Sequence, residues 1–245
     1  MDINNKKIYV NGCSFSAGHK ALRERNGKPW PELFDEDVTV INDSLNGGSS
    51  FRALRMCIEK VLESNDIDVV ICQLSGPERG EMLITADTFS RYNKDMYISY
   101  VPHKFVIDYR FTQCDILRQE GFTRQSDGET FKNEQGQTLE DRFHHKTRIF
   151  NDQVLTNPQD RHLHIIGLCN NLKILCEKKG IKLLFGAMSG RCIPNPDILC
   201  PKILTPFSHL CGTTGDLVEN DLDSHPNEAG HRKIYRYIIS ELKKL

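Results

Sequence analysis

Short apolar runs of strand length alternate along most of the chain with longer stretches whose apolar residues recur at helical spacing. The runs are residues 7–11, 37–41, 67–74 and 181–186. The third run is continuously apolar in its middle, which is typical of a strand buried on both faces. The helical stripes comprise Phe51, Leu54, Ile58 and Leu62, then apolar positions within 162–179, then Ile234, Ile238 and Leu242. This alternation predicts an α/β fold with a parallel sheet and helices on both faces.

Capping residues mark the ends of two of these predicted helices. Ser49 or Ser50 precedes the first stripe, and a serine oxygen there accepts a hydrogen bond from the first helical turn. Gly180 follows the stripe within 162–179, at the position where a glycine commonly ends a helix. The helices are therefore predicted to begin near residue 50 and to end near residue 179.

The stretch from about residue 80 to 160 does not share this alternation. It is polar, and its Asp127-Gly128 pair is typical of the turn of a β-hairpin. We interpret it as an insertion into a single domain spanning residues 1–245. Because it follows the carboxyl end of a predicted strand, we expect it to lie over the ligand-binding edge of the sheet. A second irregular, proline-containing segment, 188–224, leads to the last helix.

Composition narrows the classes of partner. The chain has 32 Lys and Arg against 33 Asp and Glu, for a net charge of −1. It therefore lacks the net positive charge that would attract nucleic acid or an anionic membrane. No apolar run approaches the ~20 residues of a bilayer span. The beginning of the chain lacks the apolar core of a signal peptide. The nine cysteines are odd in number and form no CxxC pair, which favours reduced core thiols and a cytoplasmic location.

Three polar segments follow predicted strands or precede the last helix. Ser14 comes directly after the first strand, beside Gly12, where its hydroxyl can project from the sheet edge. The segment 42–49 follows the second strand, and its glycines allow a backbone N–H to approach a ligand oxygen. His225 lies before the last helix with acidic residues nearby, an arrangement that can orient an imidazole as a base. All three are expected at the same edge of one sheet.

Together these segments resemble the SGNH (GDSL-like) hydrolase superfamily. Residues 11–16 (NGCSFS) resemble its first block, residues 42–49 its second, and residues 223–231 its last. The resemblance implies a three-layer, flavodoxin-like sandwich and a serine hydrolase with Ser14 as nucleophile. Asp223 and His225 would complete the triad, and the N–H groups of Ser14 and Gly47 would form the oxyanion hole, with Gly48 as the alternative to Gly47. The implied activity is that of an esterase or O-deacetylase on a carbohydrate or a small acylated metabolite.

Two positions depart from the pattern of that superfamily. Its acid usually lies three residues before the histidine, but Leu222 stands there, and the nearby acids are Asp223, which we favour, and Asp221. Its third block usually supplies an asparagine after the third strand, whereas this chain continues with Ser75-Gly76-Pro77-Glu78-Arg79. The oxyanion hole would then lose that donor or use Ser75 or Arg79 in its place, and Gly48, Ser75 and Arg79 are the candidates for binding the substrate.

The missing asparagine also motivates a second hypothesis, a catalytically weak or inactive binding module of the same fold that recognises an anionic or sugar ligand. Cys13, the neighbour of Ser14, is expected to face the core rather than to act as nucleophile. No cofactor is predicted, because the chain has neither a GxGxxG nor a Walker lysine motif. No metal is predicted either, since His144-His145 and His162-x-His164 lack partners at ligand spacing. The acyl group and the oligomeric state are not determined by the sequence.

Overall fold

The computed structural model describes residues 2–76, 80–84, 98–101, 104–109, 123–124, 130–132, 138–140, 158–190, 203–211, 214–218 and 225–245. The chain divides into two compact units. The first comprises Met1–Arg79 with His162–Leu245, and the second comprises Gly80–Arg161. The residues of the three polar segments that the structure describes all belong to the first unit.

A four-stranded parallel sheet forms the centre of the first unit. Its strands are β1 (Lys7–Asn11), β2 (Thr39–Asn42), β3 (Val69–Leu74) and β10 (Lys182–Ala187). Their order is β10-β3-β1-β2, and every pairing is parallel. Ile203 adds a single parallel bridge to Phe185 on the outer side of β10. When the sheet is read from β2 and its strands are counted in chain order, the order is 2-1-3-4, as in a flavodoxin-like sheet. The predicted fold class is therefore confirmed.

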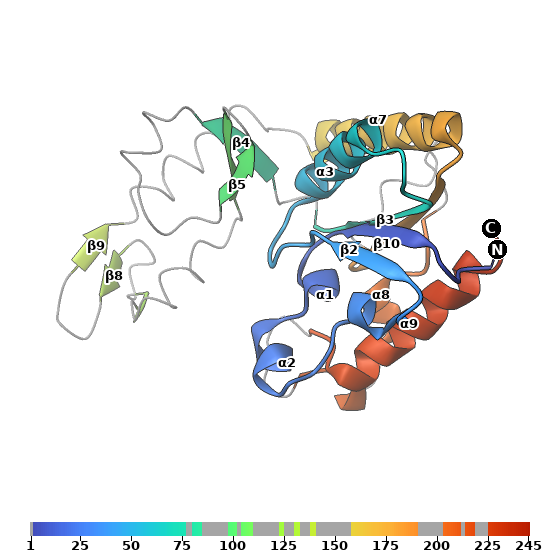
Figure 1. Cartoon of the computed structure of the whole chain (residues 1–245). Helices are drawn as coiled ribbons and strands as arrows, with labels where there is room; N and C mark the ends of the chain where they lie inside the picture. Colours follow the sequence, from blue (N-terminus) through green and yellow to red (C-terminus); the bar gives the residue numbers. More distant parts are fainter. Residues whose placement is uncertain are drawn as a thin grey trace. The chain divides into compact units, whose positions relative to one another are not determined.

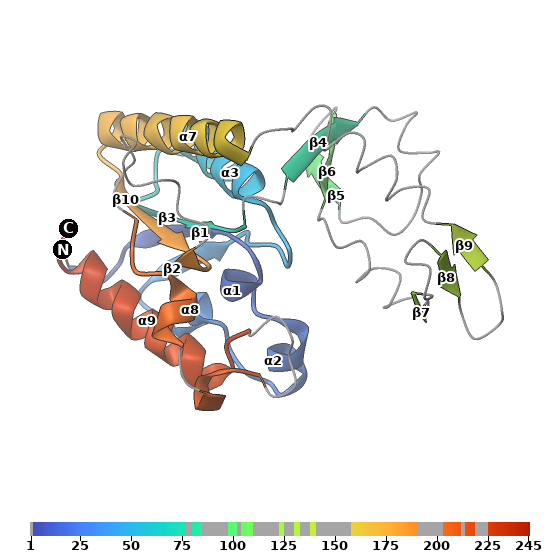
Figure 2. The ribbon, with the colours of Figure 1, turned by 180° about the vertical axis from the view of Figure 1, so that it is seen from behind.

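Helices cover both faces of this sheet (Figures 1 and 2). α3 (Ser50–Glu63) and α7 (Pro158–Lys179) lie on one face, and α8 (Phe207–Leu210) and α9 (Glu228–Leu242) lie on the other. β3 shows why both faces are apolar. Its Val70 and Cys72 belong to the cluster under α3 and α7, whereas its Val69 and Ile71 belong to the cluster under α9. Alternate side chains of one strand therefore stabilise two separate cores.

Local hydrogen bonds explain where these elements begin and end. The Ser49 hydroxyl accepts a hydrogen bond from Arg52 N at 3.0 Å and so caps α3. Gly180 takes a positive φ of 69° after α7, as the sequence predicts. β2 begins at Thr39, two residues later than expected from the run 37–41, because Val38 N donates to Asp35 O in a turn.

Short elements complete the first unit. They are the helices α1 (Ser14–Ala17) and α2 (Lys20–Glu24) and the 3-10 turns η1 (Trp30–Leu33) and η3 (Thr214–Asp216). None of the helices in the described ranges is long and apolar enough to cross a membrane. The six cysteines that the structure describes are buried free thiols: Cys13, Cys57, Cys72, Cys169, Cys176 and Cys211.

The second unit contains two three-stranded antiparallel sheets. One has the order β4-β6-β5 and the other β7-β8-β9. Their bounds are Gly80–Ile84 for β4, Ile98–Val101 for β5, Lys104–Tyr109 for β6, Thr123–Arg124 for β7, Thr130–Lys132 for β8 and Thr138–Glu140 for β9. The antiparallel pairing of β7 with β8 confirms the hairpin predicted around Asp127-Gly128. That this insertion lies over the ligand-binding edge of the sheet stays a prediction.

Two leucines of α3 offer a matched test of the core. Leu54 is fully buried between the sheet and the helices. Leu62, which the sequence pattern placed on the same apolar stripe, is 57% exposed, so that part of the prediction is wrong. Leu54→Ala should lower the free energy of unfolding by about 2–5 kcal/mol, since it removes buried methyl groups and leaves a cavity. Leu62→Ala should change it by less than about 0.5 kcal/mol. Urea denaturation of both variants measures the difference, and equal losses would contradict the assignment of this helix face to the core.

Candidate active site

Three chain segments meet at one edge of the sheet because β1, β2 and β3 run in parallel. Val10 pairs with Asn42 of β2, and Asn11 pairs with Cys72 of β3. The residues that follow these strands therefore leave the sheet at the same edge. They are Gly12 to Ser14, the loop from Asp43 to Ser49, and Ser75 with Gly76.

Ser14 and His225 are in hydrogen-bond contact at this edge. Ser14 Oγ lies 2.8 Å from His225 Nε2, although the two residues are 211 positions apart in the chain. Ser14 is 4% exposed and His225 is 7% exposed. With the ring proton on Nδ1, Nε2 accepts the hydroxyl proton of Ser14. This pair has the geometry of a nucleophile and its general base.

The segment before α9 holds His225 through its backbone. Val218 N donates to His225 O at 2.8 Å. Two residues further on, Asn227 Nδ2 donates to Gly215 O at 2.8 Å and to Leu217 O at 3.0 Å. The Asn227 side-chain oxygen also accepts from Gly230 N at 3.1 Å and so caps α9. The position of the imidazole is therefore tied both to η3 and to the first turn of α9.

Two aromatic rings contact the His225 imidazole. His19 stacks on it, with ring centroids 4.1 Å apart and an interplanar angle of 15°. Phe15 contacts it in a tilted arrangement, with centroids 5.7 Å apart. The sequence analysis missed His19. In the structure its Nδ1 accepts from Ala21 N at 3.4 Å and so caps α2. The local signal in the sequence that could have pointed to His19 is therefore its place at the start of a helix.

The turn that carries Ser14 rests on the buried amide of Gln73, a second residue that the sequence analysis missed. Gln73 Oε1 accepts from Cys13 N at 3.1 Å and from Ser16 Oγ at 2.9 Å. Gln73 Nε2 donates to Leu74 O at 3.0 Å. A Cβ at position 12 would lie 2.7 Å from the Cβ of Gln73. Only glycine at this position allows the turn to lie so close to β3.

The loop after β2 packs against the same turn. Leu45 N donates to Gly12 O at 3.0 Å. A Cβ at Gly48 would lie 3.0 Å from Gly12 O, so the two backbones are in close contact there. Gly48 N donates to Leu45 O at 2.8 Å and is therefore engaged within the loop. The N–H groups of Gly47 and Ser14 donate no hydrogen bond among the residues that the structure describes.

A buried arginine ties this loop to the sheet. Arg52 Nη1 donates to Asn11 Oδ1 and to Asp43 O, each at 3.0 Å. Asn11 Nδ2 in turn donates to the hydroxyl of Tyr9 at 3.1 Å, and burial raises the pKa of Tyr9 well above its ordinary value. Because a charge this buried is stable only when it is paired with polar groups, Arg52 fixes the first turn of α3 to β1.

The other predicted site residues divide into those that the structure describes and those that it does not. Ser75 is 1% exposed, and its backbone N and O each bond to Ser50 Oγ at 2.9 Å. Asp221, Asp223 and Arg79 lie outside the described residues, as do His144 and His145. Cys13 is fully buried in the core under α9. Within the described ranges, no group of three or more His, Cys, Asp or Glu side chains could hold a metal ion.

A polar chain connects the Ser14 turn to α9. Ser16 Oγ, which bonds to Gln73, accepts from Trp30 Nε1 at 3.2 Å. Trp30 N donates to His231 Nδ1 at 3.2 Å. Burial lowers the pKa of His231 from 6.5 to about 3, and the nearby charge of Arg23 acts in the same direction. His231 is therefore neutral in the folded protein and serves as an acceptor for the Trp30 backbone.

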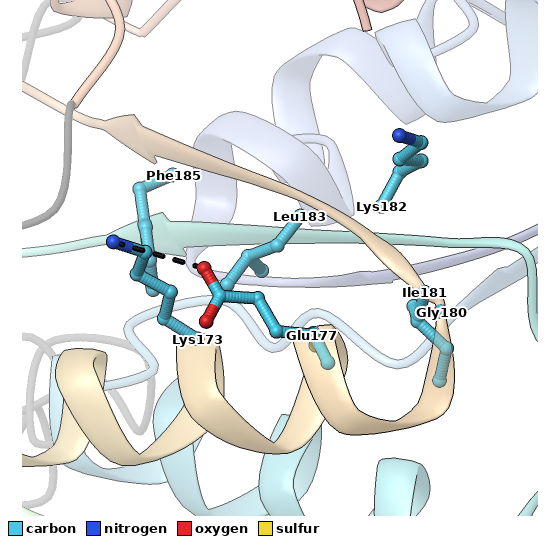
Figure 3. Close-up of a pocket in the computed structure, with 8 residues that line it drawn as sticks. Lys173, Glu177, Gly180, Ile181, Lys182, Leu183 and Phe185 are labelled. Carbon is cyan, nitrogen blue, oxygen red and sulfur yellow. Dashed lines mark ion pairs between the residues drawn. The ribbon is translucent and has the colours of Figure 1, made fainter.

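A separate pocket of about 490 Å³ lies between α7 and β10 (Figure 3). It is lined by Lys173, Cys176, Glu177, Gly180, Ile181, Lys182, Leu183 and Phe185. Lys173 Nζ lies 3.8 Å from Glu177 Oε1, and the Lys182 side chain points away from this pair (Figure 3). None of the sequence-predicted site residues lines this pocket.

No protein-family model matches the chain, and no curated protein matches it. TesA, EstA and YxiM are among the solved structures that are similar to it. TesA has a TM-score of 0.45 and 14% identity, with 98% of this chain and 99% of that chain covered. The psychrotrophic esterase EstA from Pseudoalteromonas sp. has a TM-score of 0.43 and 14% identity, with 98% of each chain covered. The protein YxiM from Bacillus subtilis has a TM-score of 0.45 and 13% identity, with 99% of this chain and 57% of that chain covered.

The buried state of His231 predicts how stability depends on pH. Between about pH 6.5 and pH 3 the unfolded chain binds a proton at this residue that the folded chain does not. Its contribution to stability is therefore complete above pH 6.5 and is lost as the pH falls, by up to about 1.4 kcal/mol per pH unit. His231→Asn keeps an acceptor for Trp30 N but does not titrate. Its free energy of unfolding should fall less steeply between pH 6.5 and pH 4.

Urea denaturation at a series of pH values measures this slope. His164→Asn, on the exposed side of α7, serves as the control and should retain the slope of the wild-type protein. Parallel curves for the wild-type protein and His231→Asn would show that His231 does not carry the effect.

Proposed function

We propose that this chain is a serine hydrolase of the SGNH type that cleaves ester bonds. The observation that carries the proposal is the 2.8 Å contact between Ser14 Oγ and His225 Nε2. Both side chains are nearly buried, and hydrogen bonds of the backbone and of neighbouring residues hold the two segments that carry them. A serine that only forms a turn or caps a helix bonds through its hydroxyl to neighbouring backbone groups. The contact of Ser14 with a distant imidazole is therefore not explained by such a structural role.

The chemistry of this pair follows from its geometry. A serine hydroxyl is a weak nucleophile at neutral pH, and an adjacent base activates it. As Ser14 Oγ attacks the ester carbonyl, His225 Nε2 takes the hydroxyl proton. The imidazolium then gives that proton to the leaving alcohol, and an acyl group remains on Ser14. Water attacks this acyl-enzyme with His225 again as the base, which releases the acid and restores Ser14.

The oxyanion hole is proposed to consist of the N–H groups of Ser14 and Gly47. Negative charge develops on the carbonyl oxygen during attack, and unpaired N–H groups aimed at it stabilise the transition state. Both N–H groups are without an acceptor among the described residues, whereas Gly48 N–H already bonds to Leu45 O. This difference favours Gly47 over Gly48 as the donor.

The third member of the triad is proposed to be Asp223, with Asp221 as the alternative. Nε2 of His225 accepts the Ser14 proton only while Nδ1 carries the ring proton, so an acceptor at Nδ1 keeps the required tautomer. An aspartate two residues before His225 in the chain is a suitable acceptor. The carboxylate would also stabilise the imidazolium that forms during attack.

A polar acyl-bearing molecule, such as an acylated glycan or a small acylated metabolite, is proposed as the substrate. Three buried polar atoms at this edge of the sheet have no hydrogen-bond partner within the described chain: Ser44 Oγ, Asn46 Oδ1 and Ser75 Oγ. Buried polar groups are nearly always paired, so these atoms favour a ligand with hydroxyl or amide groups. We propose that Ser75 and Arg79 contact the substrate and that the insertion at 80–160 shapes its selection.

The proposal predicts that a fluorophosphonate probe labels Ser14 and that the protein hydrolyses a short activated ester such as p-nitrophenyl acetate. Ser14→Ala should abolish labelling and lower kcat by roughly 10⁴–10⁶-fold, because the nucleophile and its base act as a unit. His225→Ala should lower kcat by a similar factor. Mass spectrometry of the labelled peptide and steady-state kinetics measure the two effects.

The control for these variants is His164→Ala, on the exposed side of α7, which should behave as the wild-type protein. Absence of labelling in a protein shown to be folded by circular dichroism would reject the hydrolase proposal. If that protein bound sugars or anionic ligands and Ser14→Ala left the affinity unchanged, the chain would be a binding module of the same fold.

A further inference from the structure

The ring of His19 covers one face of the His225 imidazole. α1 ends at Ala17, and the capping residue Gly18, with a φ of 83°, turns the chain so that His19 follows close to the site. The two imidazoles are stacked, with centroids 4.1 Å apart and planes at 15° to each other. This contact is closer and more nearly parallel than the contact of Phe15 with the same imidazole.

The His19 ring is held independently of His225. Its Nδ1 accepts from Ala21 N in the first turn of α2. α2 is in turn anchored by Arg23, whose Nη2 donates to Ala17 O at 3.0 Å and whose Nη1 donates to Glu32 Oε2 at 2.8 Å on η1. The backbone cap and the arginine contacts therefore give His225 a fixed surface to pack against.

We propose that His19 is a positioning residue that holds the His225 imidazole in the plane in which Nε2 faces Ser14, an inference that rests on the proposed hydrolase function. Two rotatable bonds, Cα–Cβ and Cβ–Cγ, separate the His225 ring from its backbone, so the backbone hydrogen bond at His225 O does not fix the ring plane. Phe15 contacts the ring at an angle of 41°, whereas His19 lies nearly parallel to it at 15°, so the His19 ring adds a stacked contact that opposes rotation of the imidazole.

This positioning bears on rate rather than on substrate affinity. The base must keep its direction while the proton moves first from Ser14 and then to the leaving alcohol. A displacement of a catalytic group by about 1 Å can cost roughly 10²-fold in rate. This effect requires a ring at position 19 and does not require its nitrogen atoms.

Three variants separate the ring from the other properties of His19. His19→Phe keeps an aromatic face but cannot cap α2. His19→Asn can cap α2 but has no ring to stack, and His19→Ala has neither. We expect kcat for p-nitrophenyl acetate to fall roughly 10–100-fold in the alanine and asparagine variants and to recover to within about threefold in the phenylalanine variant. KM should stay within about twofold in all three, and His164→Ala serves as the control.

A spectroscopic measurement tests the stack without relying on activity. The ring proton on Cε1 of His225 should be shifted upfield in the NMR spectrum by the stacked ring. That shift should persist in His19→Phe and disappear in His19→Asn and His19→Ala. Thermal melting of each variant shows that it is folded. If His19→Ala does not fold, the comparison of His19→Phe with His19→Asn still decides the question.

The outcomes distinguish this inference from the proposed function. Wild-type kcat in His19→Ala would overturn the role of His19 while leaving the hydrolase intact. Recovery in His19→Asn but not in His19→Phe would also overturn it and would assign the effect to the cap of α2. An unlabelled, inactive wild-type protein would reject the hydrolase function and the inference with it, whatever the variants do.

Discussion

The close approach of the β1–α1 turn to the end of β3 determines where Ser14 lies. Gln73 is fully buried, and a buried amide is stable only when its groups are hydrogen-bonded. Its oxygen accepts from Cys13 N and Ser16 Oγ, so the turn satisfies the amide and the amide fixes the turn. Gly12 makes this possible, because a Cβ there would collide with the Gln73 side chain. The direction of the Ser14 hydroxyl depends on this contact.

The rest of the candidate site is assembled on the same turn from distant parts of the chain. The loop after β2 bonds to Gly12 O through Leu45 N, and Arg52 ties that loop to β1. On the other side, the segment around His225 is bonded to η3 and to α9. Since these bonds form on folding, the entropy of bringing the hydroxyl and the imidazole together is lost before any substrate binds.

A chain of hydrogen bonds from Ser16 through Trp30 to His231 lies within the apolar layer under α9. Trp30 connects Ser16 to His231 by two hydrogen bonds, and both its neighbours are fully buried. A charge within such an apolar layer is costly. The lowered pKa of His231 keeps its ring uncharged, so its Nδ1 accepts from the Trp30 backbone, while its Nε2 has no hydrogen-bond partner among the described residues. His231 and His225, six positions apart in the chain, thus lie in very different surroundings.

Much of the fold and half of the candidate site could be predicted from local patterns. The run VVICQL predicts a buried strand, and β3 contributes alternate side chains to both cores. Ser14 and His225 were singled out by their places after a strand and before a helix. His19, Gln73 and Arg52 could not be found in this way. Their contacts join side chains of different elements, and no spacing along the chain records which way those side chains point after folding.

The sequence by itself determined the periodicities and the capping residues, because these depend on interactions between neighbours within a few residues of each other. Only the tertiary structure decided that Ser14 Oγ and His225 Nε2 lie 2.8 Å apart. That distance depends on the order β10-β3-β1-β2 and on the register of its strands. Order and register follow from how all the apolar faces of this unit pack together, which is a property of the whole and not of any one segment.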